Sequence, residues 1–325
     1  MTAQSATLAR LADLVRAGTA IEVTGVASAG AARRTLFVNL VVDGATIPAV
    51  AQIVLDRSSH LGSSAEAALL QTAARAGVPV PEVLAYDDDS GSLLTRLVEG
   101  ASIPRRVLRL AEADPRLGQK LTDDCASALA AVHSIEARAL PDLPKCQNPH
   151  EFVDQLEESL DSIRPPIPTF RLGLSWLRRH APEPVRNETL VHGDFRNGNL
   201  LVTEEGLAAV LDWELAHTGD PMEDIAWLCL RFWRFGNDAL EIGGFGEIES
   251  FHDAYDRAGG HWDDERLRWW SVARTVWWGL GLASQAQAFL GGLTDSIVFA
   301  ASGRRVVELE FDMLNLIAND HGPPV

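Results

Sequence analysis

Two short segments place acidic and carboxamide side chains at a spacing suited to phosphate chemistry. They are residues 192–199, HGDFRNGN, and residues 211–214, LDWE. The apolar runs that separate them flank a polar turn ending in glycine, a pattern that predicts a β-hairpin. Because one strand of a hairpin starts where the other ends, Asn199 and Asp212 are expected at the same end. Asp194 lies a few residues before Asn199, in a glycine-containing loop that can reach the same end of the hairpin.

These three side chains could together support the transfer of a phosphoryl group. Mg²⁺ prefers oxygen ligands and takes one or two carboxylates together with phosphate oxygens. Asn199 and Asp212 are therefore predicted to bind Mg²⁺, and Asp194 is predicted to accept the proton of an attacking hydroxyl. Each residue alone is also typical of a turn or a helix cap, but the combined pattern in its hairpin context favours phosphoryl transfer.

The same residues carry a resemblance to a known family. His192-Gly193-Asp194 with Asn199, Asp212, the segment 219–221 (GDP) and Asp224 resembles the aminoglycoside phosphotransferase family, which has a kinase-like fold. The sequences HGDFRNGNLL and VLDWELAHTGDPMEDIAWLC most resemble the branch associated with acyl-CoA dehydrogenases. The resemblance extends from about Val78 to the end of the chain and is weaker before it.

The resemblance implies an α+β, bilobal protein-kinase-like fold with a small β-rich N-lobe, residues 1–97, and a larger, mainly helical C-lobe, residues 98–325. It implies a Mg²⁺-dependent enzyme that moves the γ-phosphate of ATP or GTP to a hydroxyl of a small molecule. Asp194 would be the catalytic base, with Mg²⁺ on Asn199 and Asp212.

The resemblance also suggests supporting roles around this centre. His192 would be structural, Asp224 would brace the catalytic loop through backbone hydrogen bonds, and Asp220 would shape the segment after the metal site. Arg196 could point at the transferred phosphate, where a cation stabilises developing negative charge. The other interpretation of Arg196, a surface ion pair, stays open.

The first hundred residues are expected to form the N-lobe. Strands are predicted near residues 21–23, 36–42, 47–55 and 93–97, with a helix from Ser63 to Ala76. The candidate nucleotide-binding residues fall into four groups. Gly25, Ser28 and Gly30 belong to a loop over the phosphates, Gln52 lies on the third strand, Glu66 lies on the helix, and Thr95 and Leu97 lie at the lobe connection beside the adenine.

The N-lobe departs from the family pattern at one position. The family usually places a lysine or arginine on the third strand, paired with a helix glutamate. Here the strand carries the uncharged Gln52, and no lysine occurs in the first hundred residues. Glu66 also completes a capping box that begins at Ser63, and the cap is the favoured interpretation. Arg33 or Arg34 could supply the charge; otherwise the chain would be a kinase-like binding module without turnover.

Helices dominate the predicted C-lobe. They are expected over residues 122–135, 266–289 and 297–316, and the motif hairpin is the only hairpin expected there. The tryptophans of the second helix are expected to pack in the core rather than line an acceptor pocket. The loop 243–246 is more typical of a connector than of an acceptor site.

Composition excludes several classes of function. A net charge of −17 argues against nucleic acid and anionic membrane surfaces. Residues 1–18 have the pattern of an amphipathic helix, and no apolar run reaches membrane-spanning length. Three widely spaced cysteines favour a reducing cytoplasm. The acceptor (aminoglycoside, hydroxyacyl thioester, sugar or amino alcohol) and the oligomeric state stay open.

Overall fold

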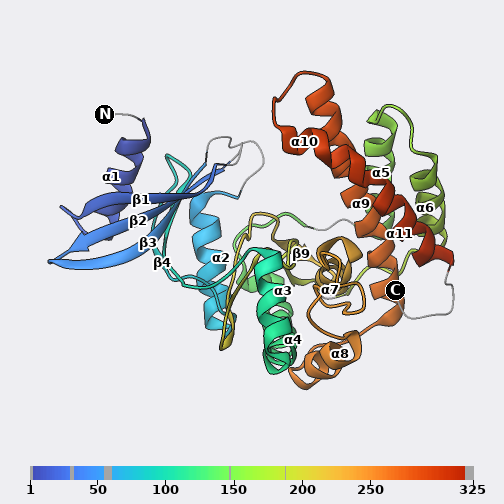
Figure 1. Cartoon of the computed structure of the whole chain (residues 1–325), viewed down its shortest axis with the longest axis horizontal. Coiled ribbons are helices and arrows are strands. Elements are labelled where there is room, and N and C mark those ends of the chain that lie inside the picture. Colours follow the sequence, from blue (N-terminus) through green and yellow to red (C-terminus); the bar gives the residue numbers. More distant parts are fainter. Residues whose placement is uncertain (1–2, 30–32, 55–60, 146–147, 187, 319–325) are drawn as a thin grey trace.

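The chain is divided between an antiparallel sheet with two helices and a larger helical part (Figure 1). The structure, a computed structural model, describes all residues except 1–2, 30–32, 55–60, 146–147, 187 and 319–325. This arrangement confirms the predicted α+β, kinase-like fold class.

The N-terminal sheet has the strand order β1-β2-β3-β5-β4, and every neighbouring pair is antiparallel. Its strands are β1 (Ala20–Ala29), β2 (Arg33–Val42), β3 (Ala45–Val54), β4 (Val83–Asp87) and β5 (Ser92–Arg96). The turn between β2 and β3 consists of Asp43 and Gly44, both at positive φ. Such two-residue turns match the right-handed twist of the strands that they join.

The two faces of the sheet are covered by different helices. Helix α1 (Ala3–Val15), predicted from its apolar spacing, packs Leu8 and Leu11 against Leu36 and other buried side chains of the sheet. Helix α2 (Ser63–Arg75) lies on the opposite face, where its apolar residues share the larger core with Leu93 of β5. Because side chains alternate along a strand, each strand contributes to both faces.

Two N-lobe predictions are wrong in their local structure. Gly25 to Ala29 form the end of β1, with bulges at two points, rather than a loop; Gly30 lies outside the described residues. Helix α2 has Gly62 at its N-cap, with no side-chain bond from its own first turn. Asp88 instead accepts hydrogen bonds from Ser63 Oγ and the Ser64 N–H, both at 2.8 Å. The capping box fails because a carboxylate from a distant turn takes the exposed N–H groups.

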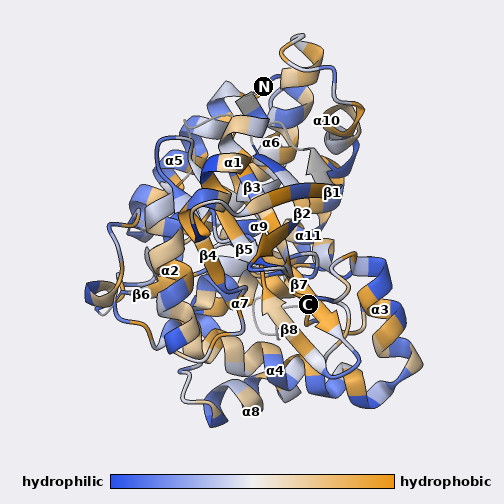
Figure 2. Cartoon of the chain, turned by 90° about the vertical axis from the view of Figure 1, so that its left-hand side faces the viewer, coloured by the Kyte–Doolittle hydropathy of each residue, from blue (hydrophilic) through white to orange (hydrophobic). Residues whose placement is uncertain are grey.

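The helical part is built around one long helix, α9 (Asp264–Leu290), which lies at its centre (Figure 1). The other α-helices are α3 (Pro104–Ala113), α4 (Pro115–His133), α5 (Pro149–Ser162), α6 (Pro168–Arg179), α7 (Met222–Cys229), α8 (Ile248–Arg257), α10 (Ile297–Ser302) and α11 (Val306–Ala318). Short 3₁₀ helices span Ala137–Ala139, Arg231–Trp233 and Gly303–Arg305. The banding of hydrophilic and hydrophobic residues on α3 and α8 in Figure 2 fits helices buried on one side.

Helix packing explains one confirmed and one wrong prediction. The core interpretation of the α9 tryptophans holds for Trp269 and Trp270, which are fully buried. The predicted single helix over 297–316 is broken into α10, the 3₁₀ turn and α11. At the break, a Cβ atom on Gly303 would lie only 2.7 Å from the Cβ of Ala286 in α9, so glycine permits the close approach.

The predicted motif hairpin is confirmed as β7 (Leu200–Thr203) and β8 (Gly206–Val210). The sequence did not predict a second pair of short strands, β6 (Thr189–Val191) and β9 (His217–Gly219), which bracket the two motif segments. Ala101, just after the N-lobe, exchanges backbone hydrogen bonds with Val202 of β7. Among the described helices, none is long and apolar enough to cross a membrane.

Candidate active site

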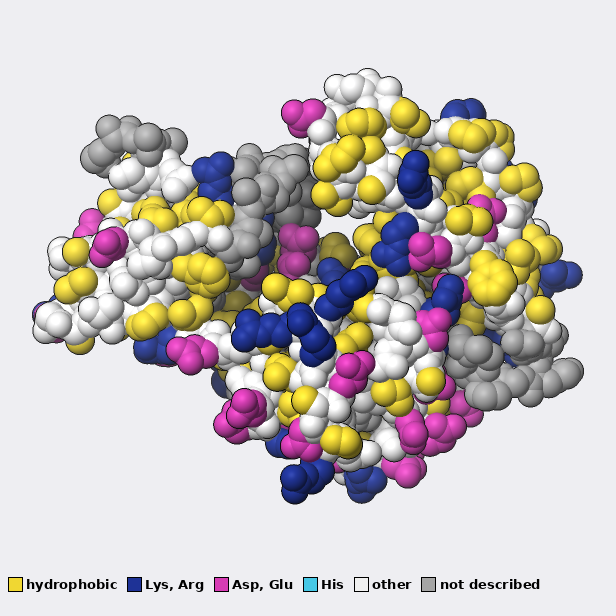
Figure 3. All heavy atoms as spheres, viewed as in Figure 1, with side chains coloured by type: hydrophobic (Ala, Val, Ile, Leu, Met, Phe, Trp, Pro, Cys, Tyr) yellow, Lys and Arg dark blue, Asp and Glu magenta, His cyan; other side chains and the backbone are white. Residues whose placement is uncertain are grey.

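The loop 192–199 connects β6 to β7 and carries Asp194. The surface is hollowed between the two parts of the molecule (Figure 3). Asp194 is only 9% exposed. Its Oδ1 accepts hydrogen bonds from Trp227 Nε1 at 2.7 Å and Arg196 Nε at 2.8 Å, and its Oδ2 accepts one from Asn199 Nδ2 at 2.6 Å. An ionised carboxylate has about four acceptor positions, so one position on Oδ2 remains for a substrate hydroxyl.

Asn199 is held in one orientation by these contacts. Its Nδ2 also donates to the backbone carbonyl of Asp194 at 3.0 Å. The backbone carbonyl of Asn199 accepts a hydrogen bond from the Leu211 N–H at 2.8 Å. With Nδ2 engaged, the side-chain oxygen Oδ1 is the atom that can bind a metal ion. The predicted proximity of Asp194 and Asn199 is therefore confirmed as a direct contact.

Asp212 follows β8, and its carboxylate interacts electrostatically with that of Asp194. Burial, together with the charges of Glu214 and Asp194, raises the pKa of Asp212 to about 7, although the charges of Arg33 and Arg196 oppose the shift. Its φ of 65° is in the left-handed region, which aspartate tolerates better than most residues. A buried carboxylate beside two others is the setting in which a divalent cation relieves repulsion, so these residues fit Mg²⁺.

A metal ion here would depend on few protein ligands. Within the part of the chain that the structure describes, no three His, Cys, Asp or Glu side chains form a metal-binding group. Asn199 Oδ1 and Asp212 would supply two ligands, and the remaining positions would fall to phosphate oxygens and water, as Mg²⁺ favours.

The loop 192–199 is anchored by Asp224 in α7. Its carboxylate accepts the backbone N–H groups of His192 at 2.7 Å and Gly193 at 2.8 Å, as the sequence predicts. Burial would raise the pKa of Asp224, but the hydrogen bond and charge of His133 outweigh it and lower the pKa. His133 in turn contacts the hydroxyl of Tyr255 at 2.7 Å, so the anchor extends to α4 and α8.

His192 and Asp220 have the structural roles expected of them. The His192 ring is buried, contacts the Leu211 carbonyl at 3.1 Å and accepts the Asp194 N–H at 3.1 Å. Burial lowers its pKa, which favours the neutral ring. Asp220 accepts the Met222 N–H at the start of α7 and pairs with Arg266 at 2.8 Å.

Arg196 forms an ion pair, and its partner is the predicted base itself. Its guanidinium also lies 4.3 Å from the centre of the Trp233 ring. This geometry fits the interpretation of Arg196 as an ion-pair residue. A contact between Arg196 and a transferred phosphate stays a prediction.

The N-lobe candidates lie on different elements. Arg33 of β2 and Glu66 of α2 form a two-bond ion pair, at 3.1 and 2.7 Å, so the favoured role of Glu66 as a cap is wrong. Gln52 lies in β3, between Thr35 and Leu93 in register. Ser28 pairs with Thr35 in the sheet; its side chain is not described.

The predicted adenine-binding positions lie at the end of β5. Thr95 is buried, and the Leu97 N–H donates to the Pro48 carbonyl at 3.0 Å. That N–H is therefore engaged within the sheet, which leaves the Leu97 carbonyl as the backbone group that could recognise a base.

Sequence reasoning missed three residues that complete the site. Trp227, for which the sequence indicated no specific role, donates a hydrogen bond to Asp194. Arg274 of α9 donates to the Gly193 carbonyl at 2.7 Å and to Glu223 at 3.0 Å, between the rings of Trp227 and Trp277. Asn197 donates to the Gly243 carbonyl at 2.8 Å and ties the 243–246 loop to the catalytic loop. No local pattern marks Trp227 or Arg274, because their partners lie 33 and 81 residues away.

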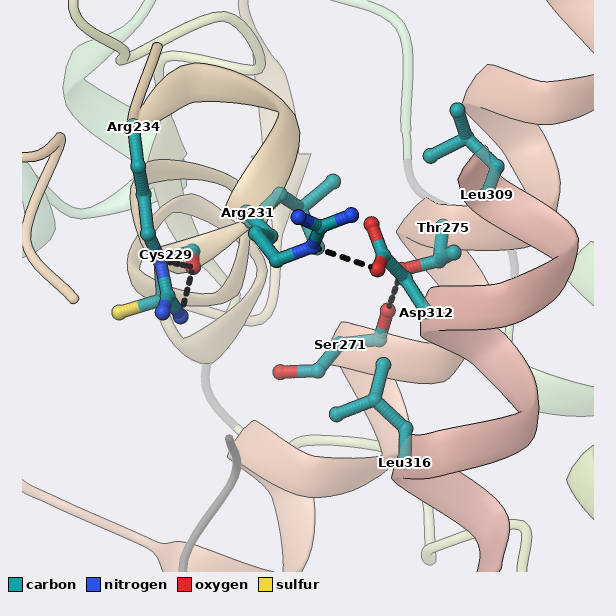
Figure 4. A pocket seen from close by; sticks show the side chains of 9 residues that line it. Cys229, Arg231, Arg234, Ser271, Thr275, Leu309, Asp312 and Leu316 are labelled. Carbon is teal, nitrogen blue, oxygen red and sulfur yellow. Dashed lines mark hydrogen bonds and ion pairs between the residues drawn. The ribbon is translucent and has the colours of Figure 1, made fainter. Parts of the chain in front are cut away.

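Two cavities differ in their relation to the predicted site residues. One, of about 420 Å³, borders Gly193 and Glu214, which adjoin the base and the metal-binding segment, and is also lined by Phe152, Arg274 and Trp277. Another, between α9, α11 and the 3₁₀ turn after α7, holds Arg231 against Asp312 at 2.8 Å (Figure 4). It contains none of the predicted site residues, and its arginines are paired, so its contacts are those of helix packing.

The bilobal fold and a catalytic loop of this geometry define a kinase-like phosphotransferase. The model of the phosphotransferase enzyme family (APH) matches residues 24–270, and the chain belongs to that family. Membership and fold together support a small-molecule phosphotransferase.

Solved structures share the fold at low sequence identity. A protein from Ralstonia eutropha JMP134 assigned to the aminoglycoside phosphotransferases is 20% identical, with a TM-score of 0.68 over 97% of both chains. A choline/ethanolamine kinase family protein from Mesorhizobium loti is 20% identical, with a TM-score of 0.61 over 98% of this chain and 94% of that chain. Aminoglycoside phosphotransferase APH(4)-Ia, of which mutant structures are ternary complexes with ADP or AMP-PNP and hygromycin B, is 18% identical, with a TM-score of 0.61 over 99% of this chain and 100% of that chain.

Curated relatives carry a matching segment within much longer proteins. Acyl-CoA dehydrogenase family member 10 of Mus musculus is 31% identical over 174 residues, 51% of this chain and 16% of that protein. Acyl-CoA dehydrogenase family member 11 of Gallus gallus is 31% identical over 185 residues, 54% of this chain and 23% of that protein. The chain thus corresponds to a minor part of these relatives, and the resemblance to their branch is confirmed.

Proposed function

We propose that the chain transfers the γ-phosphate of ATP or GTP to a hydroxyl group of a small molecule, with Mg²⁺ bound by Asn199 and Asp212. The nucleotide would lie against the N-lobe, residues 1–97, near Gly25, Ser28, Gly30, Gln52 and Glu66, with its base beside Thr95 and Leu97. The C-lobe, residues 98–325, would hold the acceptor. The cysteine pattern favours a cytoplasmic location.

The single observation that carries the proposal is the setting of Asp194. Three donors fix its carboxylate beside Asn199 and leave one acceptor position on Oδ2. A carboxylate held in this way can receive a proton from a hydroxyl placed next to it.

The reaction would proceed by displacement at phosphorus. The acceptor oxygen forms a bond to the γ-phosphorus while the bond from that phosphorus to the β,γ-bridging oxygen breaks and the nucleoside diphosphate leaves. The hydroxyl proton passes to Asp194 Oδ2. Arg196, stacked on Trp233, would balance charge on the transferred group. Mg²⁺, when bound, would neutralise charge on the phosphates.

The acceptor would enter the cavity of about 420 Å³ that borders Gly193 and Glu214. Its lining combines aromatic rings with charged groups, which suits a molecule with both apolar and polar parts. The alternative function, a binding module without turnover, rested on the uncharged Gln52 of the third strand. The Arg33–Glu66 pair makes this alternative less favoured, because Arg33 provides a cation on the same sheet.

The proposal is tested by a screen of hydroxylated metabolites with radiolabelled ATP or GTP and Mg²⁺. Phosphate incorporation is expected with the wild-type protein and with Asp295→Asn, an exposed control, and is expected to be lost in Asp194→Asn. Turnover retained in Asp194→Asn would show that Asp194 is not the catalytic base. Nucleotide binding without transfer to any acceptor would favour the binding module.

A further inference from the structure

The third strand of the sheet carries no cation where the family pattern requires one. Gln52 of β3 pairs in register with Leu93 of β5, which packs in the core on the α2 side. Residues directly opposite each other point to the same face, so Gln52 faces the α2 side of the sheet. An uncharged amide at this position leaves the nucleotide phosphates without their usual counter-charge.

A cation on the neighbouring strand occupies the same face. Arg33 of β2 pairs in register with Val54, two residues beyond Gln52 on β3. Arg33 and Gln52 are therefore diagonal neighbours, within reach of long side chains. Both members of the Arg33–Glu66 pair are buried, with side chains 11% and 6% exposed.

Resting on the phosphotransferase function proposed above, we propose that Arg33 is the cation that binds the nucleotide phosphates in this chain. It takes over from the second strand a role that related kinases give to the third. Glu66 holds its guanidinium in place, while Gln52 contributes no charge.

The guanidinium has donors left for a phosphate. Arginine has five N–H groups, and the two bonds to Glu66 use one on each terminal nitrogen. Its Nε is buried and has no hydrogen-bond partner among the described residues. Planar donors of this kind match phosphate oxygens, which makes arginine a common phosphate ligand.

Arg33 also lies on the side of the metal-binding segment. Its Nε is 4.0 Å from Glu214 Oε2, two residues after Asp212. Burial would lower the pKa of Arg33, but the carboxylates of Glu66, Glu214 and Asp212 outweigh it and raise the pKa, so the group stays charged. A phosphate held between Arg33 and a metal ion on Asp212 would be neutralised from both sides.

The adjacent arginine does not share this position. Arg34 points to the α1 face, where it donates to Gln4 Oε1 at 2.6 Å, and its neighbours Leu36 and Val38 pack in the α1 core. Strand alternation thus separates two consecutive arginines onto opposite faces. Arg34 is therefore the matched control for Arg33.

The test measures binding of ATP, GTP and their Mg²⁺ complexes by calorimetry and thermal shift. Arg33→Gln is expected to weaken nucleotide binding roughly ten- to a hundredfold, the loss typical of a charged hydrogen-bonding group. Arg34→Gln is expected to bind within about twofold of wild type, since the contact of Arg34 with Gln4 lies on the opposite face of the sheet from the site. The variant Arg33→Gln/Glu66→Gln removes both buried charges together and keeps the test valid if Arg33→Gln alone fails to fold.

A second arm returns the charge to the third strand. In Arg33→Gln/Gln52→Lys, the new ammonium group on β3 replaces the charge that Arg33 carried on β2 and is expected to face Glu66. Nucleotide affinity is expected to be at least tenfold higher than that of Arg33→Gln. Affinity that stays at the level of Arg33→Gln would contradict a shared site for the two positions.

The outcomes separate this inference from the proposed function. Wild-type affinity in the Arg33→Gln/Glu66→Gln variant overturns the role of Arg33 but leaves the phosphotransferase intact. No nucleotide binding by the wild-type protein overturns both. Equal losses in Arg33→Gln and Arg34→Gln would mean a general effect on the sheet and would also overturn the assignment.

Discussion

Trp227 donates its indole N–H to Asp194 Oδ1 over 2.7 Å, so the predicted base is oriented by a buried aromatic residue of α7. The same indole lies against Arg274 and Trp277. The carboxylate is thus held from the helical core as well as from its own loop, and the proposed proton transfer to it would need no rearrangement.

Replacement of this donor should slow phosphate transfer. Trp227→Phe keeps an aromatic ring but removes the N–H, and kcat is expected to fall roughly ten- to a hundredfold, because hydrogen bonds to charged groups contribute about 1.5–3 kcal/mol. The nucleotide KM should change little. Steady-state kinetics with the acceptor found in the screen measure both.

The matched control for this variant is Trp278→Phe. The Trp278 ring packs edge-on against Trp227, but its indole N–H has no partner among the described residues. Its kcat should stay near wild type. Equal losses in the two variants would indicate a packing effect rather than a role for the Trp227 hydrogen bond.

Removal of Mg²⁺ should reduce the stabilisation of the protein by nucleotide. At a nucleotide concentration of 100 times Kd, binding should add about 2.7 kcal/mol to the free energy of unfolding and raise Tm. EDTA, or the variant Asp212→Asn, is expected to remove the Mg²⁺-dependent part of this rise. Glu204→Gln, on the exposed turn of the same hairpin, serves as control; a shift that persists in Asp212→Asn would contradict its role as a metal ligand.

The buried pair beneath the catalytic loop should matter for stability. Arg274→Met removes one partner of the buried Glu223, which keeps its contact with His217 at 3.1 Å, and breaking a buried pair typically costs about 3–5 kcal/mol of unfolding free energy. Arg274→Met/Glu223→Gln should recover part of this loss because both charges are removed. Denaturant unfolding measures the values, and a single variant as stable as wild type would refute the prediction.

Stability should fall in mild acid because of His192. The pKa of this buried ring is lowered from 6.5, so at intermediate pH the unfolded state binds more protons than the folded state. The contribution of the neutral ring is complete above pH 6.5 and is lost as the pH falls toward the folded pKa. His192→Gln should therefore show a weaker decline in unfolding free energy between pH 7 and pH 5.

The control for the acid effect is the exposed His150→Gln, whose pH profile should follow that of the wild type. Parallel declines in wild type and His192→Gln would assign the effect to other groups. Chemical unfolding at a series of pH values separates these cases.

The sequence by itself determined the hairpin, the family and the candidate loop 192–199. These features are local: two apolar runs around a Gly-containing turn define the hairpin, and the spacing of Asp194 from Asn199 is short enough for one loop to bring them together. The bracing role of Asp224 followed from the resemblance to the family.

Only the tertiary structure decided how distant residues are paired. Arg33 meets Glu66 across 33 residues, and Asp88 rather than Ser63 caps α2, because the register of the sheet and the packing of the helix place these groups side by side. The same holds for Trp227 and Arg274, whose apolar and charged side chains could equally have joined any part of the core. Local pattern sets which face a residue points to, whereas packing between elements chooses its partner.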